Sequence, residues 1–230
     1  MNIVIATVKS WNIKNALEFK QVVSKQVNVH IIDNKEELNY QKLQELDPEY
    51  IFFTHWSWMI PKEIYEAFTC VVFHMTDLPF GRGGSPLQNL IANGIRDTKI
   101  SALKVDGGLD AGPIYIKETL NLNGTAEEIF IRASNTIFRE MIPKILDNKL
   151  LPVEQNGEAV VFKRRKIEDG EITDDFNLEK IYDYIRMLDG EGYPKAYINF
   201  GGLRLEFSRA SLKNGKIIAD VEIKEVDNNE

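Results

Sequence analysis

The chain has 230 residues, of which 43% are hydrophobic and 27% are charged. This composition is ordinary for a globular protein and allows one sizeable domain with a small appendage. The 28 basic and 35 acidic residues give a net charge of 28 − 35 = −7 with histidine neutral. Nucleic acid binding needs a basic surface, so this balance argues against a large nucleic-acid-binding face and leaves room only for a local phosphate site.

The sequence argues against a disulfide-bonded, a secreted and a membrane-spanning protein. Cys70 can form no internal disulfide and no cysteine metal cluster, so we expect a buried small side chain and no metal site. Residues 1–6 read as a strand rather than a signal peptide. No apolar stretch approaches the roughly 20 residues that span a membrane. We therefore expect a cytoplasmic protein without a membrane partner.

Short apolar runs alternate with amphipathic stretches in the first half of the chain. Runs rich in β-branched and aromatic residues predict strands over Ile3–Ala6, Val27–Ile32, Tyr50–Phe53 and Val71–Phe73. Helical spacing predicts helices over Ile13–Ser24, Lys35–Leu46 and Pro61–Phe68. This rhythm is typical of an α/β protein with an open, mostly parallel, Rossmann-like sheet and helices on both faces.

The next segment continues the α/β pattern and ends in a long helix. We predict a short helix over Leu87–Asn93 and strands over Lys99–Val105 and Gly112–Leu120. The long helix is expected from Thr125 to about Leu146, where Thr125 and Glu128 match a capping box.

The character of the chain changes after Leu150. The predicted elements are a strand in Gly157–Phe162, a helix over Asn177–Leu188, a β-meander over Ala196–Phe200, Leu203–Phe207 and Lys216–Ile223, and a frayed end over Val226–Glu230. We therefore divide the chain into an α/β domain over residues 1–150 and a small β-rich C-terminal region over residues 151–230.

His74 and Asp110 are the candidate acid and base. His74 follows a predicted strand, and Asp110 lies in a glycine-rich turn after another. In an open parallel sheet, ligands bind at the carboxyl ends of the strands, so both residues are expected at the same edge of the sheet. An imidazole moves protons near neutral pH, and a neighbouring carboxylate orients its ring. The alternative for His74 is a packed histidine at the end of a strand.

Two further segments have both a functional and a structural interpretation. Arg82 lies in a glycine loop before a helix, where a guanidinium and backbone N–H groups converge on an anion, although a plain surface arginine is the alternative. Trp56 and Trp58 follow a strand and suit a planar heterocycle, although they also fit simple packing. The basic cluster Lys163–Lys166 is either a phosphate site or a solvated turn.

Two linked motifs resemble the N10-formyltetrahydrofolate-dependent formyltransferases. The family pattern Asn-x-His-x-Ser-x-Leu-Pro-x-x-Arg-Gly-x-x-Pro corresponds to Val72–Pro86, and Asp-x-Gly-Leu-Asp-x-Gly corresponds to Asp106–Gly112. The long helix and the stretch Ile185–Phe207 resemble the sugar-modifying members most closely. The resemblance implies an N-formyltransferase whose formyl donor is N10-formyltetrahydrofolate, with residues 1–150 as its catalytic domain.

The resemblance also implies a role for each matching residue. His74 would stabilise the oxyanion that forms when an amine attacks the formyl carbon, and it would take part in proton transfer. Asp110 would hold and polarise His74 and help to move protons from the amine to the leaving nitrogen. The residues implied for the pterin pocket are Trp58, Met59, Ile60, Asp106, Gly107, Gly108 and Leu109, and those implied for the acceptor side are Thr76, Arg82 and Gly83.

One position departs from the family pattern. The family asparagine that donates to the oxyanion is Val72 here. Loss of one such donor costs about a hundredfold or more in rate. Three explanations are open: Thr54 or His55 supplies the donor, the reaction runs slowly on His74 and Asp110 alone, or the protein binds folate or sugar without catalysis.

The acceptor is inferred by exclusion and by resemblance. The charge of −7 and the short C-terminal region argue against a tRNA acceptor, and glycinamide ribonucleotide leaves the residues after Leu150 unexplained. We therefore expect an amino sugar, linked to a nucleotide, as the acceptor and no nucleic acid partner. The sugar-modifying members also imply a homodimer through the C-terminal region, because a small β piece rarely buries its own face.

Overall fold

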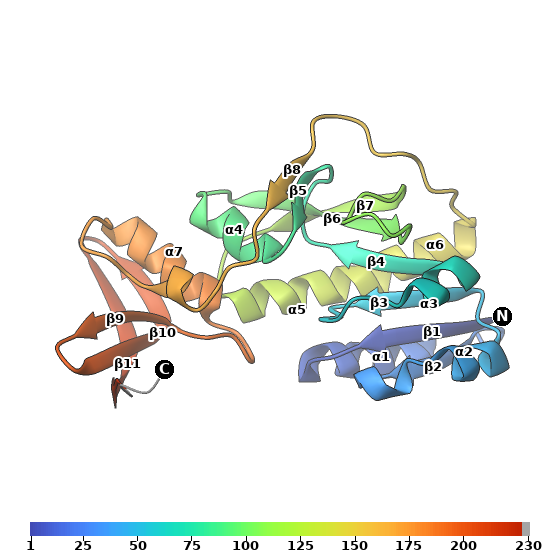
Figure 1. Cartoon of the computed structure of the whole chain (residues 1–230), viewed down its shortest axis with the longest axis horizontal. Helices are drawn as coiled ribbons and strands as arrows, with labels where there is room; N and C mark the ends of the chain where they lie inside the picture. Colours follow the sequence, from blue (N-terminus) through green and yellow to red (C-terminus); the bar gives the residue numbers. More distant parts are fainter. Residues whose placement is uncertain (227–230) are drawn as a thin grey trace. The chain divides into compact units, whose positions relative to one another are not determined.

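The computed structural model describes residues 1–226, which form two compact units (Figure 1). The first unit contains Met1–Gly83, Thr98–Leu120 and Ile131–Val161. The second unit contains Gly84–Asp97, Asn121–Phe130 and the chain from Phe162 onward. Each unit is therefore assembled from separate stretches of sequence. The predicted boundary between residues 150 and 151 stays a prediction, and the predicted frayed end lies outside the described residues except for Val226.

A six-stranded sheet forms the centre of the first unit. Its strand order is β2-β1-β3-β4-β6-β7. The bounds are β1 Asn2–Thr7, β2 Asn28–Ile32, β3 Tyr50–Thr54, β4 Cys70–His74, β6 Asp97–Lys104 and β7 Ile114–Asn121. The pairs among β2, β1, β3 and β4 are parallel, whereas β4 and β6 are antiparallel. The mostly parallel α/β sheet predicted from the sequence is therefore confirmed.

Both faces of this sheet are buried by helices. Val4 and Phe53 lie in a core cluster with Leu43 of α2 (Tyr40–Leu46) and Ile64 of α3 (Lys62–Ala67). Ile5, which alternates with Val4 along β1, is also fully buried. Because neighbouring side chains of a strand point to opposite faces, the second face must be covered too. The helix α1 (Ser10–Val22) packs against β1 and β2.

Two predicted helices are interrupted in the structure. The stretch Lys35–Leu46 divides into the short helix η1 (Lys35–Glu37) and α2, because the Asn39 side chain accepts a hydrogen bond from Lys42 N and caps a new helix. The long helix consists of α5 (Ala126–Thr136), the π-helical η2 (Ile137–Met141) and α6 (Ile142–Asn148). Pro143 has no N–H with which to continue the α-helical ladder, and the π turn directly precedes α6.

The capping box at the start of α5 is confirmed. Thr125 N donates to Glu128 Oε2 over 2.8 Å, and Glu128 N donates to Thr125 Oγ1 over 3.3 Å. One short strand was not expected from the sequence: β5 (Phe80–Gly83) pairs with β8 (Val160–Phe162) in a two-stranded sheet.

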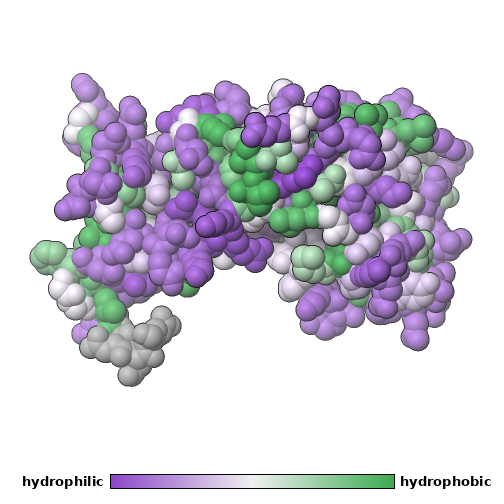
Figure 2. All heavy atoms as spheres, turned by 45° about the horizontal axis from the view of Figure 1, so that its top comes forward, coloured by the Kyte–Doolittle hydropathy of each residue, from purple (hydrophilic) through white to green (hydrophobic). Residues whose placement is uncertain are grey.

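The second unit combines α4 (Pro86–Ala92) and α7 (Leu178–Leu188) with a three-stranded sheet. Its order is β11-β10-β9, with β9 Ala196–Phe200, β10 Leu203–Lys213 and β11 Lys216–Glu225. The tight turn at Gly201 has φ 61°, as the Gly-Gly pair predicts. The expected C-terminal β subdomain is therefore present. Phe200 and Ile223 of this sheet are exposed. Figure 2 shows a face of the molecule that is mainly hydrophilic, with hydrophobic residues gathered near its centre.

Membrane-spanning helices and metal-binding groups of side chains are both absent from the described residues. Among residues 1–226, no helix is long and apolar enough to cross a membrane, and no group of three or more His, Cys, Asp or Glu side chains is arranged to hold a metal ion. Cys70 is a buried free cysteine, as predicted, and burial raises the pKa of its thiol to about 12.

Candidate functional site

His74 ends β4 and has one ring nitrogen committed to the backbone. Its Nε2 lies 2.7 Å from Gly81 O, and its side chain is about 10% exposed. A carbonyl oxygen only accepts, so Nε2 must carry the proton of the neutral ring. Nδ1 is then the basic nitrogen, and it lies 3.6 Å from Asp110 Oδ2. The ring is therefore oriented to take up a proton at Nδ1, next to a carboxylate.

Asp110 is held by its own turn and by the loop that follows β4. Its Oδ2 accepts a hydrogen bond from Gly83 N over 2.9 Å. Its φ of 47° lies in the left-handed region, which costs free energy for a residue with a side chain. The carboxylate is 21% exposed, so it is accessible to a substrate as well as to His74.

His74 and Asp110 lie close together, but contrary to our expectation the strands that precede them do not run in the same direction. Because β6 is antiparallel to β4, Val71 pairs with Lys104 and His74 pairs with Ser101. The carboxyl end of β6 therefore lies beside the amino half of β4, at the opposite edge of the sheet from His74. The turn after β6 has to fold back along the strand to bring Asp110 to His74. The expectation of a shared carboxyl edge is wrong, although the two side chains do meet.

Close packing explains one glycine in this turn. A Cβ atom added to Gly112 would lie 1.9 Å from Lys104 O, so no other residue fits there. At the start of the turn, Asp106 Oδ1 accepts a hydrogen bond from Gly108 N over 2.9 Å. Gly107 has φ 91°, and an added Cβ would lie 2.8 Å from the Tyr65 hydroxyl. Gly107, one of the two glycines predicted for the pterin pocket, thus lets the backbone pass close to Tyr65.

Gln155 is a site residue that sequence reasoning missed. Its Nε2 donates to Asp110 O and Gly112 O, both over 2.8 Å, and its Oε1 accepts from Arg82 Nε at 3.1 Å and Arg82 Nη2 at 2.7 Å. It stands in an irregular stretch without a motif, and no spacing in the sequence indicates this contact.

The residues expected on the acceptor side are largely engaged in internal contacts. Thr76 is fully buried, and its hydroxyl donates to Gly81 O over 3.3 Å. The N–H of Gly83 is used by Asp110, and two nitrogens of Arg82 are used by Gln155. These placements favour a supporting role for Thr76 and Gly83. The acceptor contact remains a prediction for all three residues.

The residues expected around the pterin separate into exposed and packed groups. Trp58 is 39% exposed, Met59 is 86% exposed and Leu109 is 59% exposed. Ile60 instead packs against the core cluster of the first unit, as Trp56 does. The Trp56 and Trp58 rings meet edge to face, with centroids 4.8 Å apart. The Trp56 Nε1 atom is buried and has no hydrogen-bond partner among residues 1–226.

Val72 completes an apolar wall at the position of the family asparagine. Its side chain is half-buried and packs against the same core cluster as Ile60. Thr54 is a poor replacement donor, because it is fully buried. Its Oγ1 accepts a hydrogen bond from Asn12 Nδ2 over 3.1 Å. His55 is half-buried with φ 52°, and its ring contacts Trp11 edge to face at 5.0 Å. Of the two expected replacements, His55 is the less buried one.

The basic cluster Lys163–Lys166 belongs to the second unit and is partly tied to its surroundings. Arg165 N donates to Ser85 Oγ over 3.0 Å, and the Arg165 guanidinium lies 5.3 Å from the centre of the Tyr184 ring. Lys166 N donates to Asp169 Oδ2 over 2.7 Å. These contacts show that the turn has a structural role. Phosphate binding, which its positive charge also allows, stays a prediction.

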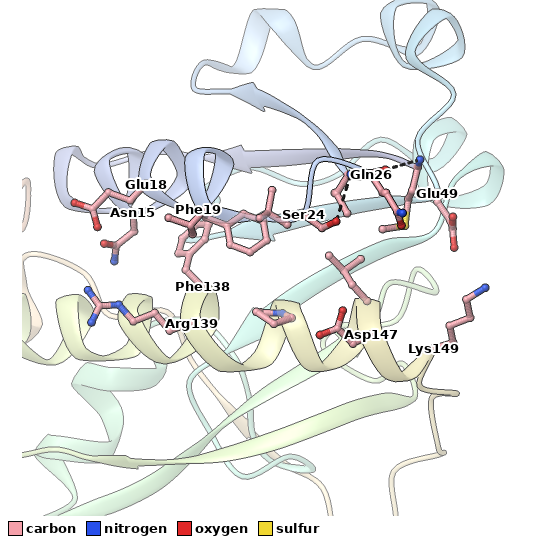
Figure 3. A pocket seen from close by; sticks show the side chains of 16 residues that line it. Asn15, Glu18, Phe19, Ser24, Gln26, Glu49, Phe138, Arg139, Asp147 and Lys149 are labelled. Atoms are coloured by element: carbon pink, nitrogen blue, oxygen red, sulfur yellow. Dashed lines mark hydrogen bonds between the residues drawn. The ribbon is translucent and has the colours of Figure 1, made fainter.

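A cavity of about 950 Å³ lies elsewhere in the first unit, between α1 and the helices η2 and α6 (Figure 3). In Figure 3 the Phe19 and Phe138 rings lie next to each other at this cavity, with centroids 6.1 Å apart. None of the predicted site residues lines this cavity. The cavity is therefore not the candidate active site. The candidate site is located instead by the contacts of His74 and Asp110.

Comparison with protein families gives two matches. A family described as formyl transferase matches residues 3–134, which include both motifs. A family described as the C-terminal domain of methionyl-tRNA formyltransferase matches residues 167–224.

Three individual proteins show the range of similarity. A methionyl-tRNA formyltransferase of a Nitratiruptor species is 28% identical over 218 residues, 91% of this chain. The chain spans 66% of the length of that relative. The structure of a methionyl-tRNA formyltransferase from Clostridium thermocellum has 67% identity and a TM-score of 0.97, and the match covers 98% of this chain and 100% of that one. A sugar N-formyltransferase from a Shewanella species shares the fold, with 15% identity, a TM-score of 0.71, and coverage of 93% and 99%.

These similarities correct the expected acceptor. The relatives at 28% and 67% identity are named as methionyl-tRNA formyltransferases, whereas the sugar enzyme is 15% identical. The amino-sugar acceptor and the absence of a nucleic acid partner are therefore wrong as predicted. The net charge misled because it averages over the whole surface, and the region judged too short for a tRNA enzyme matches the C-terminal family. The expected homodimer has no support in these similarities.

Proposed function

Because the chain belongs to the formyl transferase family, we propose that it transfers the formyl group of N10-formyltetrahydrofolate to the amino group of methionyl-tRNA. The observation that carries the proposal is the His74–Asp110 pair, with Nδ1 and Oδ2 3.6 Å apart in the motif of that family. The enzyme class and the formyl donor both accord with the family.

Two similarities support methionyl-tRNA as the acceptor. Residues 167–224 match the C-terminal domain of methionyl-tRNA formyltransferases, and the Clostridium thermocellum protein of that name is 67% identical over its whole chain. Lys163–Lys166, which directly precedes this region, supplies local positive charge for a phosphate backbone. A cytoplasmic location, expected from the sequence, stays a prediction.

The residues around the Asp106 turn fit a flat heterocycle with polar edges. The exposed part of the Trp58 ring offers an aromatic surface, and Val72, Ile60 and Trp56 supply apolar walls on a shared core. The donor, when bound at this place, supplies an activated formyl group.

In this proposal, His74 and Asp110 transfer the proton that the reaction moves from the amine to N10. The acceptor amine forms a bond to the formyl carbon, the bond from that carbon to N10 breaks, and one proton passes from the amine to N10. His74 Nδ1 is the basic atom in reach of that proton, and Asp110 stabilises the ring while it is charged. The contact at 3.6 Å is long for a hydrogen bond and is expected to tighten when substrates bind.

The test is a turnover assay with matched acceptors. The protein is mixed with N10-formyltetrahydrofolate and methionyl-tRNA, uncharged tRNA, free methionine or a nucleotide-linked amino sugar. Release of tetrahydrofolate is measured, and the product is hydrolysed to identify formylmethionine. We expect release and formylmethionine only with methionyl-tRNA. Release with a different amine would reject the proposed acceptor, and no release with any acceptor would reject the enzyme.

Val72 favours one second candidate, a protein that binds folate without catalysis. An apolar side chain at this position removes a donor to the developing oxyanion. Tetrahydrofolate binding measured by calorimetry separates the two functions. Binding without release in the turnover assay supports the second candidate, and release above the rate of the His74→Gln variant excludes it.

A further inference from the structure

Gln155 lies in the stretch between α6 and β8, where its neighbours point outward. Val153, Glu154 and Asn156 are all exposed, whereas Gln155 is half-buried. The backbone of Val153 pairs with that of Ile114 through two hydrogen bonds of 2.8 and 2.9 Å. The stretch is thereby anchored on β7, and Gln155 is the side chain that it directs toward the site.

The amide of Gln155 is fully used, and only an amide can make this set of contacts. Both Nε2 hydrogens go to carbonyl oxygens of the Asp110 turn, and Oε1 receives two hydrogens from Arg82. A carboxylate has no hydrogen to donate, and a lysine has no atom to accept one. Gln155 therefore links a donor in β5 to two acceptors in the turn after β6.

This link fixes the backbone from which the Asp110 carboxylate projects. One of the two carbonyls belongs to Asp110 itself, whose φ of 47° needs support from its surroundings. The other, at Gly112, ends the turn. Arg82 is adjacent in sequence to Gly83, whose N–H holds the Asp110 carboxylate. The Asp110 backbone is thus tied to Gln155 directly, and the Asp110 carboxylate is tied to it through Arg82 and Gly83. Arg82 also follows Gly81, whose carbonyl oxygen lies 2.7 Å from His74 Nε2.

We propose that Gln155 is a positioning residue for formyl transfer: it fixes the Asp110 turn to Arg82 and so sets the distance between Asp110 and His74. The proposal rests on the proposed function for its kinetic consequence, but its geometric consequence is independent of the acceptor. Gln155 itself touches neither reacting group, so its effect should fall on kcat rather than on donor binding.

Two substitutions and one control test the link. Gln155→Glu keeps an acceptor for Arg82 but turns an oxygen toward two carbonyls, and Gln155→Met removes all four hydrogen bonds at similar volume. Glu154→Gln, at the exposed neighbouring position, is the matched control. We expect kcat to fall about tenfold or more in both Gln155 variants, because misplacement of a catalytic group by an ångström costs up to about a hundredfold. The KM for the donor should stay within about twofold of wild type.

A spectroscopic measurement tests the same geometry without turnover. The ¹⁵N chemical shifts of the His74 ring are followed in full-length wild type and variants from about pH 5 to 9, where imidazoles titrate. We expect displaced shifts in Gln155→Glu and Gln155→Met and wild-type shifts in Glu154→Gln. If the wild type transfers no formyl group, the proposed function fails, and the ring shifts alone decide the role of Gln155. His74 shifts that are the same in all four proteins would overturn the proposal, as would wild-type kcat in Gln155→Glu.

Discussion

The two units each contain a cluster of charged side chains, and the clusters differ in how closely their charged groups are paired. The second cluster is the closer one, although its Arg186 Nη2 atom is buried without a hydrogen-bond partner among residues 1–226. In the first unit, His74 and Asp110 are 3.6 Å apart, and the Asp110 side chain is 21% exposed. In the second unit, Arg186 is 1% exposed and donates to Asp183 Oδ1 over 2.7 Å, to Leu122 O over 2.6 Å and to Gly124 O over 2.9 Å.

This difference in pairing distinguishes residues that we expect to take part in the reaction from residues that we expect to stabilise the fold. Asp183 also accepts from Arg96 over 3.0 Å, so its cluster joins three segments of the second unit and leaves little room for a ligand. His74 and Asp110 make fewer contacts to each other than they make to the backbone. Because the His74 ring is held through Nε2, its Nδ1 atom faces Asp110 and stays available to a substrate. Substitutions in the two clusters should therefore affect different measurements.

The largest effect is expected for His74→Gln and Asp110→Asn. Each removes a proton-transfer group while keeping a similar shape, so kcat should fall about 10²- to 10⁴-fold. The free energy of unfolding in urea should change little, because neither residue is part of a close ion pair. A variant that keeps wild-type kcat removes its residue from the mechanism, and a large loss of stability would place the pair with the structural cluster.

The second effect is expected for Asp183→Ala. It leaves the buried Arg186 guanidinium without its carboxylate, which costs about 3–5 kcal/mol of unfolding free energy. Urea unfolding measures this loss, with Lys62→Ala on the exposed face of α3 as the control. The kcat of the fraction that remains folded should stay near wild type. A loss below about 1 kcal/mol would contradict the structural role of the cluster.

A smaller effect is expected at the start of α5. Thr125→Ala removes one half of the capping box, which costs about 1 kcal/mol. The urea midpoint should fall without a change in the slope of the transition. A Thr125→Ser variant retains the hydroxyl and should restore most of the stability. If alanine and serine behave alike, the hydroxyl contact does not contribute.

The smallest effect near neutral pH is expected at Cys70. Burial raises the pKa of its thiol from an ordinary value of 9.0 to about 12, so the folded state holds the proton more tightly than the unfolded state. The contribution to stability is therefore complete below about pH 9 and is lost as the pH rises toward 12. Thiol labelling at about pH 8, below the ordinary pKa, should be slow when the protein is folded and rapid in urea. Rapid labelling of the folded protein would show that Cys70 is not buried.

The fold was predictable where the pattern is local. Buried runs of β-branched residues located β1 and β3 to within a residue, and the Thr125–Glu128 spacing located the start of α5. The break in Lys35–Leu46 was not predicted, because an asparagine cap competes with helical spacing that continues across it. The direction of β6 was not predicted either, since a strand's sequence does not record whether its partner is parallel.

The site was predictable only where a motif covers it. His74 and Asp110 stand in paired motifs, whereas Gln155 reaches the same turn from a distant stretch without one. Thr76 belongs to the motif but is buried, so its place in the pattern reflects packing as much as substrate contact. The acceptor was missed because net charge describes the average surface rather than the region that matches tRNA-modifying relatives.

Transfer of a labelled formyl group tests the central claim most directly. N10-formyltetrahydrofolate with a ¹³C-formyl group is mixed with methionyl-tRNA and either wild type or His74→Gln, at equal concentrations of folded protein. We expect the label on the methionine nitrogen with wild type and at least about a hundredfold slower transfer with His74→Gln, as loss of a general base implies. Transfer at the same rate by both proteins would contradict the role of the His74–Asp110 pair.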